Sequence, residues 1–143
     1  MIFKSLNRNT KAIIYIQIIG MLMGFFTHLS WVLKNGFLSK NYNAPLISSV
    51  FWDSLTFLDP LAAILLFLKP KSGIYLTLSI ITVDVIHNNF FYLDELYINA
   101  PHLTEWIVKY WMILGQIIFG VFILLTFKNN LAEINDKTFT YSS

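Results

Sequence analysis

Two acids and a histidine stand inside apolar segments of this chain, at spacings that could transfer a proton. Asp84 and His87 lie in "DVIHNN", which Ile, Leu, Val and Thr surround, and Asp53 lies in "FWDSLTFLDP". A carboxyl group beside an imidazole suits isomerisation or hydrolysis, because one group donates a proton as the other accepts one. Asp53, Asp84 and His87 are therefore the candidate catalytic, ligand-binding or proton-transfer residues.

The segments that carry these residues are typical of a membrane protein. The 143 residues are 56% hydrophobic and 13% charged, which is too apolar for an ordinary soluble domain. Four apolar runs, at about 12–33, 46–68, 74–92 and 106–127, are each near the ~20 residues with which an α-helix crosses a ~30 Å hydrocarbon core. The sequence predicts an all-α, polytopic membrane protein, with one transmembrane domain formed by an up-down-up-down bundle of four helices.

The distribution of charge predicts the orientation of the bundle. Basic residues accumulate in cytoplasmic segments of membrane proteins. The loop before the fourth run contains no Lys or Arg, whereas the two ends of the chain and the second loop contain Lys4, Arg8, Lys11, Lys69, Lys71, Lys128 and Lys137. We expect an integral membrane protein with both termini cytoplasmic, in the cytoplasmic membrane if the protein is bacterial. The last sixteen residues are polar and are expected to form a short tail.

Helical periodicity at 100° per residue gives each run one polar or small-residue face. In chain order the faces hold Gln17, Gly20, Gly24, His28 and Trp31; Ser49, Trp52, Asp53, Thr56, Asp59, Pro60 and Ala63; Thr77, Asp84, His87 and Asn88; and Lys109, Met112, Gln116 and Gly120. The opposite faces are mostly apolar, so the four polar faces are expected to meet inside the bundle.

Depth along the helices predicts a polar pocket in the outer half of the membrane. At 1.5 Å per residue, the side chains of His28, Asp53, Asp84 and His87 lie about 8–12 Å below the outer ends of their helices. Asp59 lies deeper, as the floor of the pocket. The expected ligand-binding residues are His28, Trp52, Asp59, Asn88 and Gln116. No metal site and no cofactor are predicted, because "D-x-x-H" alone is a weak metal motif. The absence of cysteine excludes thiol–disulfide chemistry.

The energetics of burial favour a functional role for this cluster. A charged residue at the bilayer centre costs ~2.5–3.5 kcal/mol on insertion scales, so the acids need partners, protons or water. A lone Asp–His pair could be a structural latch. Five ionisable groups on facing helices are more than four short helices need to hold together; they are His28, Asp53, Asp59, Asp84 and His87. For Gln17, Ser49, Thr56, Thr77 and Gln116, hydrogen bonding between helices is the simpler interpretation.

Three functions are compatible with such a pocket. The first is binding of a membrane lipid or lipid-like molecule with a polar head, with isomerisation or another transformation of that molecule as an extension. The second is a proton- or cation-coupled transporter, which must be an oligomer because four helices are few for transport. The third is a structural or regulatory partner of another membrane protein. The G-x-x-x-G pattern of Gly20 and Gly24 would allow a homodimer, and no feature indicates nucleic-acid binding.

The layout of the chain resembles a known family. Four spans, an acid and a proline in "FWDSLTFLDPLA", a histidine in the third span and a short basic C-terminal exit are similar to the EXPERA family of emopamil-binding proteins and sigma-2 receptors. The resemblance implies a four- or five-helix bundle with sterol isomerase activity, or binding of sterols and cationic amphiphiles. It covers most of the chain but aligns no individual residue.

Overall fold

Four long helices make up the computed structural model, which describes residues 2–93, 98 and 102–142. They are α1 (Arg8–Asn35), α2 (Leu46–Leu68), α3 (Pro70–Phe91) and α4 (Leu103–Ser142), accompanied by the short 3-10 helices η1 (Ile2–Ser5) and η2 (Lys40–Tyr42). Each long helix is long and apolar enough to cross a membrane. The chain is an all-α integral membrane protein, as the sequence predicts.

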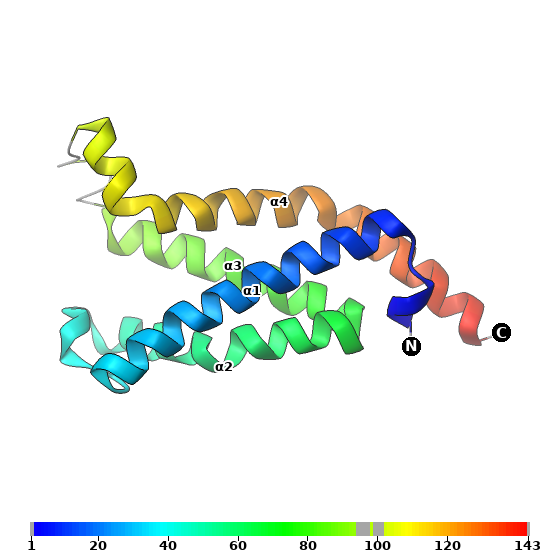
Figure 1. Ribbon diagram of the computed structural model, residues 1–143, viewed down its shortest axis with the longest axis horizontal. Helices are drawn as coiled ribbons and strands as arrows, with labels where there is room; N and C mark the ends of the chain where they lie inside the picture. Colours follow the sequence, from blue (N-terminus) through cyan, green and yellow to red (C-terminus); the bar gives the residue numbers. More distant parts are fainter. Residues whose placement is uncertain (1, 94–97, 99–101, 143) are drawn as a thin grey trace.

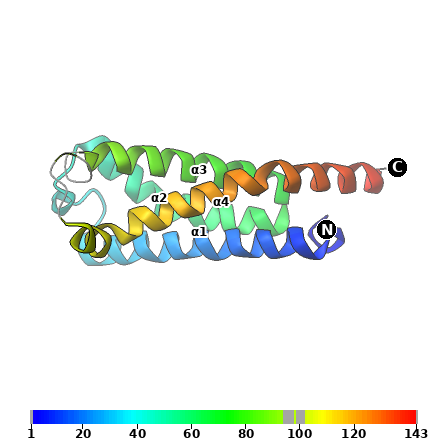
Figure 2. The ribbon, with the colours of Figure 1, turned by 90° about the horizontal axis from the view of Figure 1, so that it is seen from above.

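The helices alternate in direction, so the predicted up-down-up-down bundle is confirmed (Figure 1). Both termini and the α2–α3 turn lie at one end, which we call the terminal end. The α1–α2 and α3–α4 connections lie at the other, which we call the loop end. Seen from above, α1 and α4 lie beside each other in the terminal half (Figure 2). Seven of the ten Lys and Arg residues belong to the segments at the terminal end.

The α2–α3 turn is shorter than the sequence predicts. Only Lys69 separates the two helices, and α3 begins at Pro70 instead of near residue 74. Proline suits the first position of a helix, because its missing N–H would have no helical partner there. Gly73 permits the tight turn: a Cβ on this residue would lie 2.3 Å from the backbone nitrogen of Leu66.

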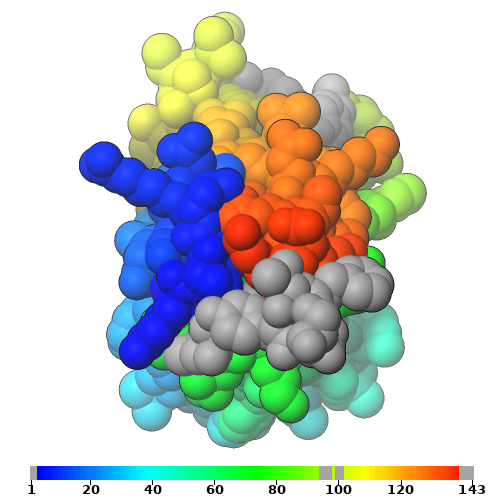
Figure 3. Space-filling model, turned by 90° about the vertical axis from the view of Figure 1, so that its right-hand side faces the viewer, coloured from blue at the N-terminus to red at the C-terminus, as the bar shows by residue number. Residues whose placement is uncertain are grey.

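Helix α4 extends beyond the predicted 106–127 at both ends. Its first residues, 103–109, bend away from the bundle at Tyr110, which has non-helical φ and ψ of −115° and 19° (Figure 1). The predicted C-terminal tail is wrong, since the helix continues to Ser142. Ile134 is fully buried in this extension, so packing against the bundle favours the helix. Figure 3 shows the extension lying against the N-terminal segment at the terminal end.

The two glycines of the G-x-x-x-G pattern pack inside the bundle. A Cβ on Gly20 would lie 2.4 Å from the Phe119 ring of α4, and one on Gly24 would lie 2.6 Å from the Oδ2 atom of Asp59 in α2. Both glycines therefore make close contacts with side chains of the same chain. A homodimer through this face stays a prediction.

Candidate functional site

Asp53, the first sequence candidate, holds the α1–α2 connection in place. Its Oδ1 atom accepts a hydrogen bond from the Tyr42 hydroxyl at 2.7 Å, and its Oδ2 atom accepts one from the Leu38 backbone N–H at 2.5 Å. Leu38 has a φ of 51°, a strained value for this residue type, which the bond to Asp53 helps to maintain. Burial and the Asp53 bond raise the pKa of Tyr42 above its ordinary value. We call this arrangement the Asp53 latch.

The rings around this latch close the loop end of the bundle. The Tyr42 ring lies 4.9 Å from that of Trp31 and 5.1 Å from that of Trp52, centroid to centroid. Half-buried His28 interacts electrostatically with Asp53, as the predicted convergence requires, but makes no hydrogen bond to it. With two donors and a nearby imidazole, Asp53 is accounted for by its structural role.

Asn88 joins three helices through a single amide group. Its Nδ2 atom donates to Asp84 Oδ1 in α3 and to Gln116 Oε1 in α4, both at 2.9 Å. Its Oδ1 atom accepts from the Trp52 indole N–H of α2 at 2.8 Å. Both donors and the acceptor of the amide are thus used. We call these four residues the Asn88 network; the sequence predicted all of them as site residues.

His87 does not form the predicted acid–imidazole pair. Its ring lies 4.8 Å from the Phe51 ring and 5.4 Å from the Trp52 ring, and its buried Nε2 atom has no hydrogen-bond partner among the described residues. His87 is adjacent to Asn88 in sequence, which places it 100° away around the helix. Asp84 and Asn88, four residues apart, share a face that His87 leaves for the side of α2.

Asp59 and Asp84 form a pair of buried carboxylates with little compensation. They are 3% and 5% exposed, and the charge of Asp84 acts on Asp59. Within the described part of the chain, Asp84 accepts one hydrogen bond, from Asn88, and Asp59 accepts none and contacts no cation. The oxygen of Asp59 instead occupies the space left by the missing side chain of Gly24. We call Asp59 and Asp84 the acid pair.

Further polar side chains, in the middle and the terminal half of the bundle, are buried without partners. Among the described residues no hydrogen bond is formed by the side-chain amides of Gln17 and Asn130 or by the hydroxyls of Thr56 and Thr77. An unsatisfied buried polar group costs roughly 1–3 kcal/mol. The interhelical hydrogen bonds expected of Gln17, Thr56 and Thr77 are therefore not formed by protein groups described here.

Two residues of this region lie in the predicted tail, so the sequence reading missed them. Asn130 is fully buried, and the spacing of Ile123, Phe127, Asn130 and Ile134 would have indicated that the inward face of α4 continues. The carboxylate of Glu133 accepts hydrogen bonds from the Asn7 backbone N–H and the Thr10 hydroxyl, both at 2.5 Å, and from the Asn7 side chain. No local signal identifies this contact across 126 residues of chain.

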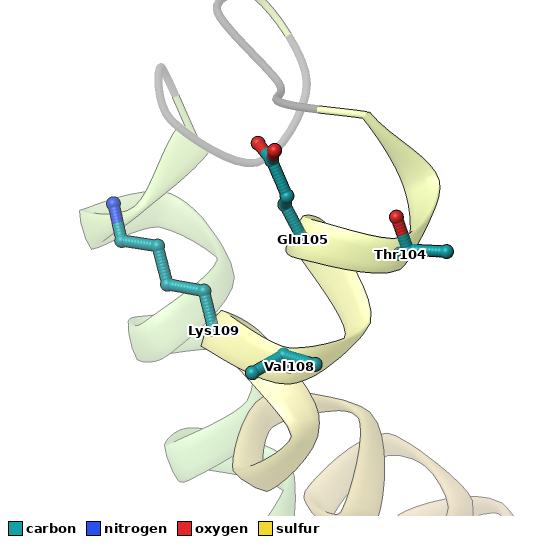
Figure 4. Close-up of a pocket in the computed structure, with 4 residues that line it drawn as sticks. All are labelled: Thr104, Glu105, Val108 and Lys109. Atoms are coloured by element: carbon teal, nitrogen blue, oxygen red, sulfur yellow. The ribbon is translucent and has the colours of Figure 1, made fainter.

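A shallow surface hollow lies away from these groups, on the bent first turns of α4 (Figure 4). Its lining residues are Thr104, Glu105, Val108 and Lys109, and the Lys109 ammonium group lies 5.0 Å from the centroid of the Tyr110 ring. None of these residues was a sequence candidate for the site, but periodicity placed Lys109 on the inward polar face of the fourth span, whereas the structure leaves it exposed. The hollow is outside the bundle and separate from the acid pair.

Comparison with protein-family models, with curated proteins and with solved structures found no match to this chain. The likeness to the EXPERA family therefore stays an expectation from layout. The arrangement of the side chains is the ground on which function can be argued.

Proposed function

We propose that this membrane protein binds a proton or another monovalent cation at the acid pair, as the subunit of a cation-coupled transporter. The observation that supports the proposal is the burial of both Asp59 and Asp84, with the charge of Asp84 acting on Asp59 and a single hydrogen bond between the two acids and the rest of the described chain. Two carboxylates inside a membrane bundle require a compensating positive charge. A proton or small cation bound by the two carboxylates supplies that charge.

Contrast with Asp53 argues against a purely structural role for the acid pair. Asp53 accepts bonds from Tyr42 and Leu38, so its carboxylate stabilises the loop end directly. Asp59 has no such donor among the described residues. A residue that only fastened helices together would be expected to bond to one of them. The cost of burying Asp59 is explained if the carboxylate is used when a cation binds.

The transporter would act as an oligomer, because four helices provide few surfaces for alternating access. We place the terminal end in the cytoplasm, since it carries seven of the ten Lys and Arg residues. The cation then meets a basic surface at one end of the bundle and the aromatic closure at the other.

A second candidate is binding of a hydrophobic molecule with a polar head beside His87. The observation that favours it is the unpaired Nε2 atom of a half-buried imidazole, flanked by the rings of Phe51 and Trp52. Aromatic faces suit an apolar body, and the imidazole can donate to or accept from a polar head. Mass spectrometry of molecules that co-purify with the wild type and with His87→Leu tests this candidate.

The cation proposal is tested with purified protein in lipid vesicles. Uptake of protons, followed with an enclosed pH dye, and of labelled Na⁺ is driven by a K⁺ diffusion potential. Asp59→Asn and Asp84→Asn should each lower uptake roughly tenfold or more, because the amide carries no charge. The control is Glu105→Gln, which removes a carboxylate outside the bundle and should leave uptake unchanged.

Infrared difference spectroscopy provides a second readout. A protonation step at the acid pair gives a carboxyl C=O band that Asp59→Asn or Asp84→Asn removes. Wild-type vesicles that transport neither cation would overturn the proposal, as would uptake that survives both substitutions. Uptake lost in Asp53→Asn but retained in Asp59→Asn would move the site to the pocket predicted from sequence.

A further inference from the structure

Three fully buried polar side chains lie on three helices of the terminal half. Gln17 of α1, Thr77 of α3 and Asn130 of α4 are each 0% exposed. Neither amide atom of Gln17 or Asn130, nor the hydroxyl of Thr77, has a partner among the described residues. Two amides with all of their capacity unused are a rare feature in a protein core, because buried polar groups are normally paired with protein or with ordered water.

Contacts between α1 and α4 place Gln17 and Asn130 in the same stretch of the core. At the terminal end, Thr10 of α1 bonds to Glu133 of α4. Further in, the Phe119 ring of α4 covers Gly20 of α1. Gln17 lies between Thr10 and Gly20, and Asn130 lies between Glu133 and Phe119. The two amides therefore belong to one section of the α1–α4 interface.

Thr77 belongs to the same section of the bundle. On one side of it, the Tyr75 ring of α3 contacts the Phe127 ring of α4 at 5.5 Å. On the other side, Ile81 of α3 lies against Gly120 of α4. Thr77 thus lies at the level of the stretch of α4 between residues 120 and 127, next to the turn that carries Asn130.

The same side chains lead to the acid pair. Gln17 precedes Gly24 by seven residues, and Thr77 precedes Asp84 by seven. Seven residues are two helical turns, so Gln17 shares a face of α1 with Gly24, and Thr77 shares a face of α3 with Asp84. Gly24 is the residue against which Asp59 packs. Gln17 and Thr77 therefore lie two helical turns nearer the terminal end than Gly24 and Asp84, on the same helix faces, with the Phe119 ring over Gly20 between Gln17 and Gly24.

The loop side of the acid pair is closed in a different way. The amide of Asn88 is saturated, and the Trp52 ring packs edge-on against the Phe91 ring at 5.0 Å. Groups that are saturated or aromatic offer nothing to an additional polar ligand. Of the described side chains that lack a partner, the amides of Gln17 and Asn130 and the hydroxyl of Thr77 lie on the terminal side, whereas the ring nitrogens Nε2 of His87 and Nε1 of Trp31 lie at the loop end.

We propose that Gln17, Thr77 and Asn130 bind water, forming a hydrated path from the terminal end to Asp59 and Asp84. An amide both donates and accepts, and a hydroxyl does the same, so the three side chains match the two to four hydrogen bonds that a buried water makes. The cation of the proposed function reaches the acid pair along this path. The role of this path in cation binding rests on the proposed function. Its hydration can be measured without a transport assay.

Radiolytic hydroxyl-radical footprinting of the full chain in lipid nanodiscs tests the proposal. X-ray pulses split bound water, and the radicals oxidise side chains beside it. Met21 is 3% exposed and one turn from Gln17, so it is the reporter, and lipid-exposed Met23 is the reference in the same helix. We expect rapid oxidation of Met21, reduced roughly threefold or more by Gln17→Leu or Asn130→Leu, which remove the ligands of the water. Asn89→Leu is the matched control, because its amide bonds to the Val85 carbonyl near the loop end.

The two ideas fail separately in these experiments. Slow oxidation of wild-type Met21, or rapid oxidation that both leucine variants leave unchanged, overturns the hydrated path even if Asp59→Asn abolishes uptake. Rapid oxidation that the leucine variants suppress supports the path even if vesicle uptake overturns cation transport. If one leucine variant does not fold, the other gives the result.

Discussion

The loop-end and terminal halves of this bundle differ in how their buried carboxylates and amides are paired. In the loop-end half, Asp53 accepts two hydrogen bonds and Asn88 makes three, while the ring nitrogens Nε2 of His87 and Nε1 of Trp31 are left without a partner among the described residues. From Asp59 to the terminal end, Asp59, Gln17 and Asn130 have no partner among the described residues. Both halves bury carboxylates and amides. Only for Asp53 and Asn88 do hydrogen bonds within the protein explain the burial.

This difference separates architecture from function. A satisfied polar network fixes which helices pack together and at what register, and its removal should weaken the protein. An unsatisfied polar group opposes folding by roughly 1–3 kcal/mol, so an apolar substitution should relieve the cost. The direction of the stability change is therefore a test of the comparison at each position.

The largest change is expected for Asn88→Leu. It leaves the Trp52 indole, the Asp84 carboxylate and the Gln116 amide without their shared partner, and should lower the free energy of unfolding by about 2–3 kcal/mol. Steric-trapping measurements of unfolding in bicelles check the value, with Asn89→Leu as the neighbouring control. An unchanged stability would mean that the network does not hold the loop-end half together.

Asp59→Leu should change stability by a similar amount in the opposite direction. Removing an uncompensated buried carboxylate is expected to raise the free energy of unfolding by about 2 kcal/mol, while cation uptake is lost. The same unfolding assay measures the gain, and Asp53→Leu, which breaks a latch, should show a loss instead. A loss for both substitutions would remove the distinction between the two acids.

Tyr42→Phe should lower the free energy of unfolding by about 1 kcal/mol, the usual value of one hydrogen bond. The pKa of the Tyr42 hydroxyl is raised by burial and by Asp53, so the folded protein keeps a proton that the unfolded chain has lost. The contribution of Tyr42 is thus complete below the ordinary tyrosine pKa of about 10 and declines as pH rises above it. The difference in tyrosinate absorbance between the wild type and Tyr42→Phe, followed as the pH is raised, measures the ionisation of Tyr42. Ionisation of Tyr42 at the ordinary tyrosine pKa would contradict the latch.

The smallest change is expected for Glu133→Gln at the terminal end. The carboxylate faces the N-terminal turn of α1, where a negative charge is favourable, and its loss should cost about 0.5 kcal/mol. Hydrogen exchange of the amides in residues 7–11 should accelerate roughly twofold by the same free energy. Glu105→Gln is the control, and equal exchange in both variants would show that the polar contact at this end is not structural.

Much of the fold could be predicted from the sequence, because each helix carries its own signal. The run 46–68 matches α2 residue for residue, since an apolar segment of this length has few alternatives in a membrane. The α4 extension was missed because Lys128 ends the apolar run, although buried Ile134 keeps the helical spacing. The bend at Tyr110 was missed as well, because no proline or glycine marks it.

For the candidate site, periodicity identified the residues but not their partners. Periodicity correctly placed Asp84 and Asn88 on one face of α3. It wrongly added His87 to that face, because a stripe of residues spaced by three or four is too broad to separate neighbours that lie 100° apart around the helix. It expected Asp53 to be in the functional group, whereas the Tyr42 hydroxyl and the Leu38 N–H take its carboxylate. Both partners come from a loop that has no period to follow.

The sequence by itself determined that the helices lie in a lipid bilayer, that there are four of them and that both termini lie at the same end of the bundle. Hydrophobic length and charge distribution act on each segment separately, so they can be read without the tertiary structure. Only the tertiary structure decided which polar groups are satisfied. Hydrogen bonds depend on ångström distances between helices that are distant in sequence, as between Trp52, Asn88 and Gln116. For that reason Asp53 became a structural latch, and Asp59 became the uncompensated acid at the centre of the bundle.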